Sequence, residues 1–397
     1  MSYYYKLGSI PHKRHTQFRQ PDGSLYHEEL IGTLGFSGVQ SLLYHLRPPT
    51  QIQRIVWKQP TEIIYEESAP LYPRHLRTNT VSQRGDAICE AGADAIASRV
   101  PLLGNADLCI SIARPSEPMQ YWYRFAHGDE ILFIHDGSGI LESQFGILHY
   151  QPGDYLVIPT GILWRILPDA DVEQRMLVLE TWGHIQPPRR YLNEYGQFLE
   201  TSPYCERDLR PPEKLITYDE RGEFEVRVKA RGGITSYLYQ HHPLDIVGWD
   251  GHLWPFALNI EDFEPITGRI HQPPPVHQTF AGSGFVICSF VPRLFDYHPL
   301  AIPAPYNHAN VDSDEVIYYV EGNFMSRLGT ERSSITFHPS GIPHGPHPGK
   351  YQGSIGKERT DEVAVMIDTF RPLKLTTQGL LFEDKDYPYS WSEPINI

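Results

Sequence analysis

Hydrophobic residues occur along the chain in short runs that end at proline, glycine, asparagine or aspartate. Representative runs are EILFIHD, GDYLVIP, EVIYYVEGN, SSITFHPSG and EVAVMIDTF. Short runs of apolar and β-branched residues between turn residues are typical of an all-β sandwich or barrel. Few helices are expected, for example around residues 91–98 and 187–199. The pattern therefore predicts an all-β protein with long loops.

Two regions of the chain share one pattern. In the C-terminal region, Glu315 is followed by x6-G and then by PSGIPH, which ends at His344. In the N-terminal region, Glu130 is followed by x6-G and then by PTGILW, which ends at Trp164. Both regions read E-x6-G followed by P-x-G-x-x-(H or W). Such self-similarity indicates an internal duplication of one structural unit.

The C-terminal copy contains a candidate metal site. His308 precedes an expected strand, Glu315 begins it, and His344 follows the P-x-G turn of the next hairpin. Two histidines and one carboxylate on adjacent strands can occupy one face of a metal, leaving positions for substrate and O2, as in non-haem Fe(II) oxygenases. Asp312 and Asp314 are competing carboxylates. Because a strand alternates its faces, Asp314 and Glu315 cannot both point inward, and the E-x6-G pattern favours Glu315.

The N-terminal copy lacks this ligand set. Trp164 stands where the C-terminal copy has its second histidine. An indole N–H only donates a hydrogen bond and cannot bind a metal. We therefore expect the N-terminal copy to be structural, with Trp164 in its core.

Two further histidines are candidates for acid–base chemistry. His338 lies in the same hairpin as His344, and His271 lies in GRIHQPPPVHQTF, where three prolines restrict the backbone. A reaction on a phenol needs a base for the hydroxyl and a donor near bound oxygen. Either histidine can serve in this way, or it can support the metal ligands or lie on the surface.

Charge and composition limit the kinds of binding partner and the cellular compartment that are expected for this chain. The formal net charge is −14, which is the opposite of what binding to nucleic-acid phosphates requires. No apolar stretch approaches the length that spans a membrane, and the first residues lack the apolar core of a secretory signal. The cysteines form no CxxC pair, so a reducing, cytoplasmic location and small buried thiols are expected. These cysteines are Cys89, Cys109, Cys205 and Cys288.

Long segments of the chain resemble one known family. LYHEELIGTLGFSGVQSLLYHLRPP, HPLDIVGWDGHLWPFALNIEDF and GRIHQPPPVHQTF resemble its opening and middle segments. YNHANVDSDE and TFHPSGIPHGPHPG resemble its metal-site segments. The family is homogentisate 1,2-dioxygenase, and the resemblance covers nearly the whole chain. It implies a cupin or jelly-roll fold, with an N-terminal β-sandwich domain over 1–265 that holds a vestigial cupin copy. A C-terminal cupin barrel over 266–397 would carry the iron.

The resemblance also implies an activity. Fe(II) would be bound by His308, Glu315 and His344, with His271 and His338 as active-site histidines. The enzyme would open the ring of homogentisate with O2 to give maleylacetoacetate, in tyrosine and phenylalanine breakdown. The resemblance further implies a homo-oligomer, either a trimer or a hexamer built as a dimer of trimers.

One position departs from the family pattern. Where the animal enzymes have a tyrosine that helps to hold the substrate, this chain has Phe324, which cannot donate a hydrogen bond. Tyr306 or Asn323 would then bind the substrate carboxylate, or the substrate would be gentisate or another substituted hydroquinone. A metal-free bicupin that only binds small molecules is the alternative from another class of protein.

Overall fold

The computed structural model describes residues 3–66, 70–79, 93–230, 232–322, 324, 327 and 329–392. Within these ranges the protein is built of β-strands, with one short α-helix, α1 (Lys350–Ser354), and several 3₁₀ turns. This confirms the predicted all-β class. No helix among these residues is long and apolar enough to cross a membrane.

The two expected helices are wrong where the structure describes them. Residues 91 and 92 lie outside the described ranges, and residues 95–98 form a single turn. The segment 187–199 contains only the 3₁₀ turn η3 (Arg189–Tyr191). Asn193 explains why, since its side-chain oxygen accepts hydrogen bonds from the backbone N–H of Tyr195 (2.9 Å) and of Gln197 (3.0 Å). Such a side-chain bond stabilises a turn in place of a helix.

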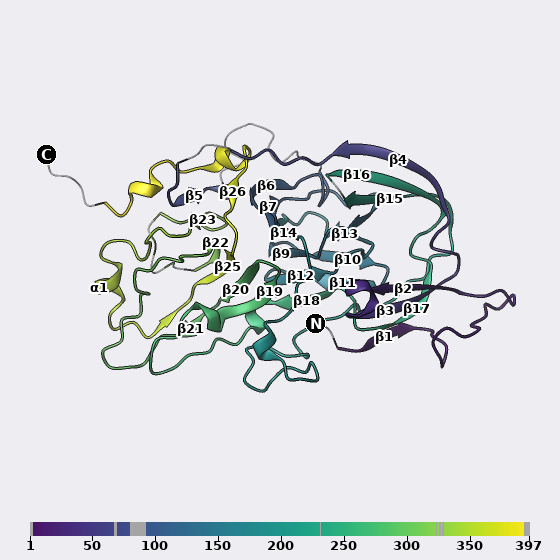
Figure 1. Cartoon of the computed structure of the whole chain (residues 1–397), viewed down its shortest axis with the longest axis horizontal. Coiled ribbons are helices and arrows are strands. Elements are labelled where there is room, and N and C mark those ends of the chain that lie inside the picture. The colour runs from purple at the N-terminus through teal and green to yellow at the C-terminus, as the bar shows by residue number, and fades with distance from the viewer. Residues whose placement is uncertain are drawn as a thin grey trace.

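Two seven-stranded sheets form the N-terminal part of the molecule, in the centre and on the right of Figure 1. The first has the order β11 (Gly146–Tyr150), β10 (Gly139–Ser143), β13 (Trp164–Pro168), β8 (Trp122–Phe125), β15 (Arg221–Ala230), β16 (Gly233–His241) and β4 (Ile52–Pro60). The second has the order β18 (Phe256–Asn259), β12 (Asp154–Ile158), β9 (Glu130–Asp136), β14 (Arg175–Thr181), β7 (Leu108–Ala113), β6 (Val100–Gly104) and β26 (Lys374–Leu375). Their inner faces bury large side chains without exposure, among them Phe133, Tyr155 and Trp164.

A six-stranded sheet forms the C-terminal part, on the left of Figure 1. Its order is β19 (Gln278–Gly282), β20 (Phe285–Phe290), β25 (Val363–Thr369), β22 (Asp314–Glu321), β23 (Ile335–His338) and β5 (Arg74–Leu76). Beside it lies the pair β21 (Arg293–Leu294) and β24 (Arg359–Thr360). The two parts exchange strands, because β5 comes from the N-terminal half and β26 returns from the C-terminal half.

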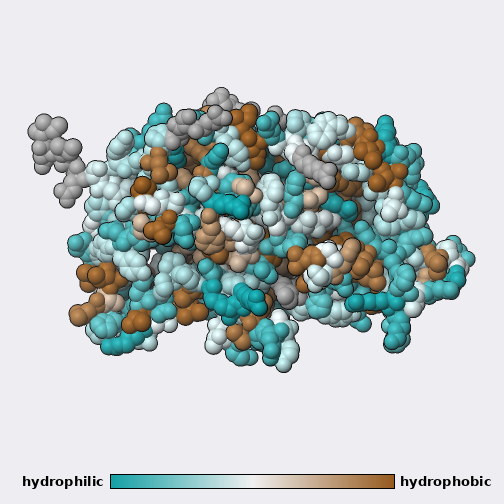
Figure 2. Space-filling view, viewed as in Figure 1, coloured by the Kyte–Doolittle hydropathy of each residue, from teal (hydrophilic) through white to brown (hydrophobic). Residues whose placement is uncertain are grey.

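A four-stranded sheet completes the fold, in the order β1 (Tyr5–Gly8), β17 (Ile246–Gly251), β3 (Gln40–His45) and β2 (His27–Gly32). The strand β4 lies at the edge of its sheet and exposes apolar side chains, namely Ile52, Ile55, Val56 and Trp57. Figure 2 shows hydrophobic residues gathered at the upper right, where Figure 1 places β4. An exposed apolar edge strand is a surface on which another protein chain can pack.

The strand registers confirm the internal duplication. Glu130 on β9 pairs with Glu180 on β14, as Glu315 on β22 pairs with Asp368 on β25. An aromatic residue lies seven residues before each glutamate. Its backbone forms a β-bridge with the last residue of the P-x-G-x-x-(H or W) motif. These bridges join Tyr123 to Trp164 in the N-terminal copy and His308 to His344 in the C-terminal copy.

The duplication extends to hydrogen bonds of the residue that precedes each glutamate. Asp314 is buried and accepts hydrogen bonds from the backbone N–H of Ser340 and of Leu373, both at 2.7 Å. The first bond holds the P-x-G turn that leads to His344. The equivalent N-terminal bonds, at 2.8 and 2.7 Å, join Asp129 to Thr160 and Ile185. The sequence pattern therefore marks two copies of one cupin hairpin unit.

The described cysteines are free thiols, as expected, but the expected burial holds only for Cys109 and Cys288. Cys109 and Cys288 are buried, Cys205 is half-buried, and none of the three forms a disulfide. Cys89 lies outside the described residues.

Candidate metal centre

The three predicted ligands converge in space. Ligand atoms of His308, Glu315 and His344 all lie within 4.8 Å of one another. His308 Nε2 is 3.7 Å from Glu315 Oε2, and His344 Nε2 is 3.5 Å from Glu315 Oε1. A pair of backbone hydrogen bonds, 2.8 Å each, joins His308 to His344 and fixes the separation of the two rings.

The imidazole hydrogen bonds show which nitrogen of each ring faces the centre. His308 Nδ1 lies 3.1 Å from the carbonyl of Tyr306, and His344 Nδ1 lies 3.0 Å from the carbonyl of Ile342. A carbonyl only accepts, so each Nδ1 carries the proton and each Nε2 directs a lone pair towards Glu315. His344 Nε2 is buried and has no hydrogen-bond partner. Two lone pairs and a carboxylate that face one another form a donor set that a divalent metal fits.

The competing carboxylates do not reach this centre. Asp314 points to the opposite face of β22, where it holds the two backbone N–H groups described above, and Asp312 is exposed. Glu315 is buried, and although burial opposes its charge, the hydrogen bond from His338 Nδ1 (2.9 Å) helps to hold the pKa of Glu315 well below its usual range. Glu315 is therefore the carboxylate that the arrangement offers to a metal.

His338 lies behind the metal centre. Its Nδ1 is 2.9 Å from Glu315 Oε1, its Nε2 is 3.3 Å from the hydroxyl of Tyr387, and its ring stacks on His344 at 4.5 Å. The side chain is completely buried, and it does not line the cavity that the described residues form. Burial lowers the pKa of His338 to about 3, so the neutral ring donates to Glu315 and accepts from Tyr387. This geometry favours a role in positioning Glu315.

Replacing His338 by alanine should weaken metal binding while leaving all three ligands in the chain. Loss of a residue that orients a metal ligand typically lowers metal affinity about 10–100-fold. The measurement is the dissociation constant for Fe(II) under anaerobic conditions. His135→Ala is the matched control, since His135 is equally buried but bonds to Tyr318 (2.6 Å). Equal losses of affinity in both variants would show that His338 has no specific role at the metal.

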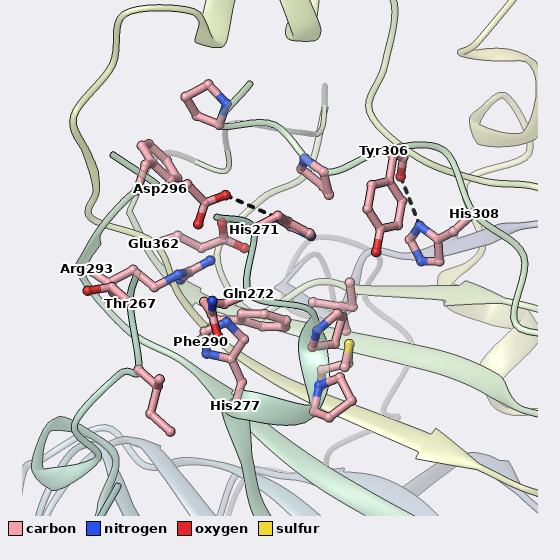
Figure 3. A pocket seen from close by; sticks show the side chains of 18 of the residues that line it. Thr267, His271, Gln272, His277, Phe290, Arg293, Asp296, Tyr306, His308 and Glu362 are labelled. Atoms are coloured by element: carbon pink, nitrogen blue, oxygen red, sulfur yellow. Dashed lines mark hydrogen bonds and ion pairs between the residues drawn. The ribbon is translucent and has the colours of Figure 1, made fainter. Parts of the chain in front are cut away.

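A cavity of about 410 Å³ opens in front of the metal centre (Figure 3). His271 lines it, and its Nδ1 lies 3.2 Å from Asp296 Oδ2, so the carboxylate orients the ring and leaves Nε2 as a proton acceptor. The ring of Tyr306 is 5.0 Å from that of His271 and 6.4 Å from that of His308. His271 and Tyr306 therefore lie on the cavity wall near one ligand. No pattern in the sequence marks Asp296 as a site residue, because only the folded chain brings its loop to His271.

Asp368 is a second residue that the sequence did not reveal. It pairs with Glu315 across β22 and β25, lines the cavity, and has a buried Oδ1 without a hydrogen-bond partner. Burial, together with the charge of Glu315, raises the pKa of Asp368 to about 7. Its side chain thus offers a polar atom to a molecule in the cavity.

The residues expected near the substrate carboxylate fall in different places. Tyr306 lines the cavity and is 55% exposed. Asn323 lies outside the described residues. Phe324 packs against Tyr319 at 4.5 Å in a small apolar cluster and does not line the described cavity. Phe324 stands where the animal enzymes have a tyrosine, but its ring does not form part of this cavity wall.

The N-terminal copy contains an internal cation at the corresponding place. Arg99 Nη1 lies 2.7 Å from Glu130 and 2.8 Å from Glu180, and its guanidinium faces the rings of Tyr123 (5.7 Å) and Trp164 (6.0 Å). These four residues occupy the register positions of Glu315, Asp368, His308 and His344. As expected, Trp164 is completely buried. The guanidinium supplies the positive charge that a metal would supply in the other copy.

Arg99→Met should destabilise the fold strongly. Removing one partner of a buried ion pair leaves uncompensated charge and typically costs about 3–5 kcal/mol of unfolding free energy. The test is chemical denaturation, with Arg359→Met as control. Arg359 forms an exposed pair with Asp361 at 2.9 Å, and such pairs contribute about 0–1 kcal/mol. Similar losses in the two variants would contradict a structural role for the Arg99 cluster.

The fold and the site together define a class of protein. The described chain is an all-β protein of the cupin type, with two copies of the cupin hairpin unit and one His–Glu–His group that can hold a metal at a cavity wall. Residues 6–260 match the family model described as homogentisate 1,2-dioxygenase N-terminal. The Saccharolobus solfataricus protein named "Putative dioxygenase SSO1533" is 42% identical over 395 residues, covering 98% of this chain and 99% of that protein. The chain therefore belongs to the homogentisate 1,2-dioxygenase family and is an enzyme of the dioxygenase type.

Solved structures with a similar fold are more distant. A cupin 2 conserved barrel domain protein from Leptotrichia buccalis is 9% identical with a TM-score of 0.35, covering 78% of this chain and 100% of that chain. A mutant form of the Bacillus subtilis oxalate decarboxylase OxdC is 12% identical with a TM-score of 0.31, covering 84% of this chain and 83% of that chain.

Proposed function

We propose that the enzyme is an Fe(II)-dependent dioxygenase that opens the aromatic ring of homogentisate with O2 to give maleylacetoacetate, in tyrosine and phenylalanine breakdown. One observation carries the proposal. His308, Glu315 and His344 converge beside a cavity of about 410 Å³ whose wall also holds His271. A cavity of this size accommodates a small aromatic molecule.

His308, Glu315 and His344 would hold the iron, and when bound the iron orients both reactants and overcomes the spin barrier to reaction with O2. His271 would accept or hold the proton of a substrate hydroxyl at Nε2, because Asp296 engages its Nδ1. Asp368 would meet a polar atom of the substrate from β25. His338 would keep Glu315 in place from behind.

Location and assembly follow from the same proposal. We propose a cytoplasmic enzyme, on the ground that its described cysteines are free thiols. The proposed partners are the aromatic substrate, O2 and further copies of the chain, in a trimer or hexamer, with no nucleic acid and no membrane. The exposed apolar residues of β4 support contact with another chain.

Metal content and substrate preference test the proposal. The purified chain, loaded anaerobically with Fe(II), should retain about one iron per chain, because one copy has the ligand set and the other has Tyr123 and Trp164. With O2 supplied, kcat/KM for homogentisate should exceed that for gentisate. Two equivalent irons per chain would contradict the assignment of a single metal site. A preference for gentisate would show that gentisate, and not homogentisate, is the substrate.

A further inference from the structure

One buried arginine in the cavity wall forms no ion pair with the residues that the structure describes. Arg327 lines the cavity and is only 6% exposed. Its Nη1 donates to the backbone carbonyl of Gly345, and its buried Nε has no hydrogen-bond partner. No acidic side chain of the described residues forms an ion pair with Arg327. Glu315 and Glu362 of the same cavity wall act on its charge from a distance, but neither forms an ion pair with it. The buried Nε therefore still lacks the hydrogen-bond partner that an anion in the cavity would supply.

Arg327 lies at the metal end of the cavity. It bonds to Gly345, the residue after the ligand His344, and it shares the cavity wall with His308 and Glu315. A divalent metal held by two neutral imidazoles and one carboxylate keeps one positive charge. Together with Arg327, this end of the cavity then carries two positive charges. A substrate carboxylate that enters this end of the cavity would meet both positive charges.

The chemistry of homogentisate places its carboxylate at this end. Its acetate arm is attached to the ring carbon next to a hydroxyl-bearing carbon. When that hydroxyl faces the metal ligands, the arm lies beside them and within reach of a neighbouring cation. We infer that Arg327 binds the carboxylate of the substrate and makes the enzyme selective for hydroquinones with an acidic side arm ortho to the reacting hydroxyl. This inference rests on the proposed function, and it gives the role expected of Tyr306 or Asn323 mainly to Arg327.

Arg293 is the competing cation and lies elsewhere in the cavity. It begins β21, its Nη1 donates to the carbonyl of Val291 (3.1 Å), and its guanidinium lies 5.4 Å from the ring of Phe290. Figure 3 shows Arg293 on the opposite side of the view from His308, with His271 between them. An acetate arm next to the metal-bound hydroxyl therefore points away from Arg293. This makes Arg293→Met a matched control within one cavity.

The test compares homogentisate with methylhydroquinone, which has the same ring and no charge on its side arm. Arg327→Met, Arg293→Met and Tyr306→Phe are loaded with Fe(II), checked for equal metal content, and titrated anaerobically with each compound. Arg327→Met should weaken homogentisate binding at least about 30-fold, as expected when a buried charge partner is lost. Tyr306→Phe should weaken it about tenfold or less, since a neutral donor is lost. Arg293→Met should leave it unchanged, and methylhydroquinone binding should change little in any variant.

Several results separate this inference from the proposed function. Arg327→Lys should recover part of the homogentisate affinity, because the charge returns without the planar fork. Equal weakening of both compounds by Arg327→Met, or a larger loss in Arg293→Met, would overturn the inference. Failure of the wild-type enzyme to bind homogentisate more tightly than methylhydroquinone would also overturn it. If the wild type binds homogentisate selectively through Arg327 but does not turn it over, the inference holds and the proposed function fails.

Discussion

Glu315→Ala should retain no Fe(II) after dialysis and show no turnover. Glu315 is the single carboxylate in the His–Glu–His group, and both histidines direct Nε2 towards it. Its removal leaves two neutral nitrogens, which hold a hard divalent ion weakly. Metal analysis and O2 uptake on the same sample measure both effects.

Asp314→Asn is the matched control for this prediction. Asp314 precedes Glu315, but its oxygens accept hydrogen bonds from Ser340 and Leu373 on the other face of the strand. The asparagine variant should keep iron and activity while losing some thermal stability, because an amide replaces one acceptor. If a folded Asp314→Asn protein loses iron while Glu315→Ala keeps it, the assignment of the metal carboxylate is wrong by one residue.

His271→Ala should keep iron and lose most of its kcat. His271 does not belong to the group of ligand atoms, but it lines the cavity with its Nδ1 held by Asp296. Removing a residue that takes a substrate proton typically lowers the rate about 10²–10⁴-fold. Single-turnover kinetics at saturating homogentisate, on protein of known iron content, give the effect on chemistry.

Two comparisons make this result specific to proton transfer. Asp296→Asn should lower kcat less than His271→Ala, because the ring stays present while its orientation is weakened. His298→Ala should leave kcat unchanged, since His298 is exposed and lines only a neighbouring groove. Iron loss in His271→Ala, or an unchanged kcat, would show that His271 has another role.

The local pattern predicted the centre of the site because a cupin hairpin places ligands at fixed distances along the chain. The E-x6-G spacing selected Glu315 over Asp314, and the same spacing marked the N-terminal copy. Strand alternation then separates the two acidic side chains in both copies. These relations depend on a few neighbouring residues, so one sequence is enough to reveal them.

The remaining features depend on contacts between distant segments. Asp296 meets His271 across 25 residues, and Arg99 reaches Glu180 across 81 residues. The role proposed for Arg327 depends on its place in the wall of a cavity that several loops and strands enclose. The two expected helices failed for the opposite reason, since turn-forming side chains such as Asn193 overrode a weak local preference. Neither kind of feature has a periodic signal in the sequence.

The central claim is that this chain inserts O2 into the ring of homogentisate. The most direct test supplies isotopically labelled O2 to the Fe(II)-loaded enzyme with homogentisate and determines the mass of the product. The account predicts a ring-opened product with one labelled oxygen in its new carboxylate and the second in its new ketone, where exchange with water removes it over time, and no such product from Glu315→Ala. A ring-opened product without any labelled oxygen, or an unaltered ring despite bound iron and bound homogentisate, would contradict it.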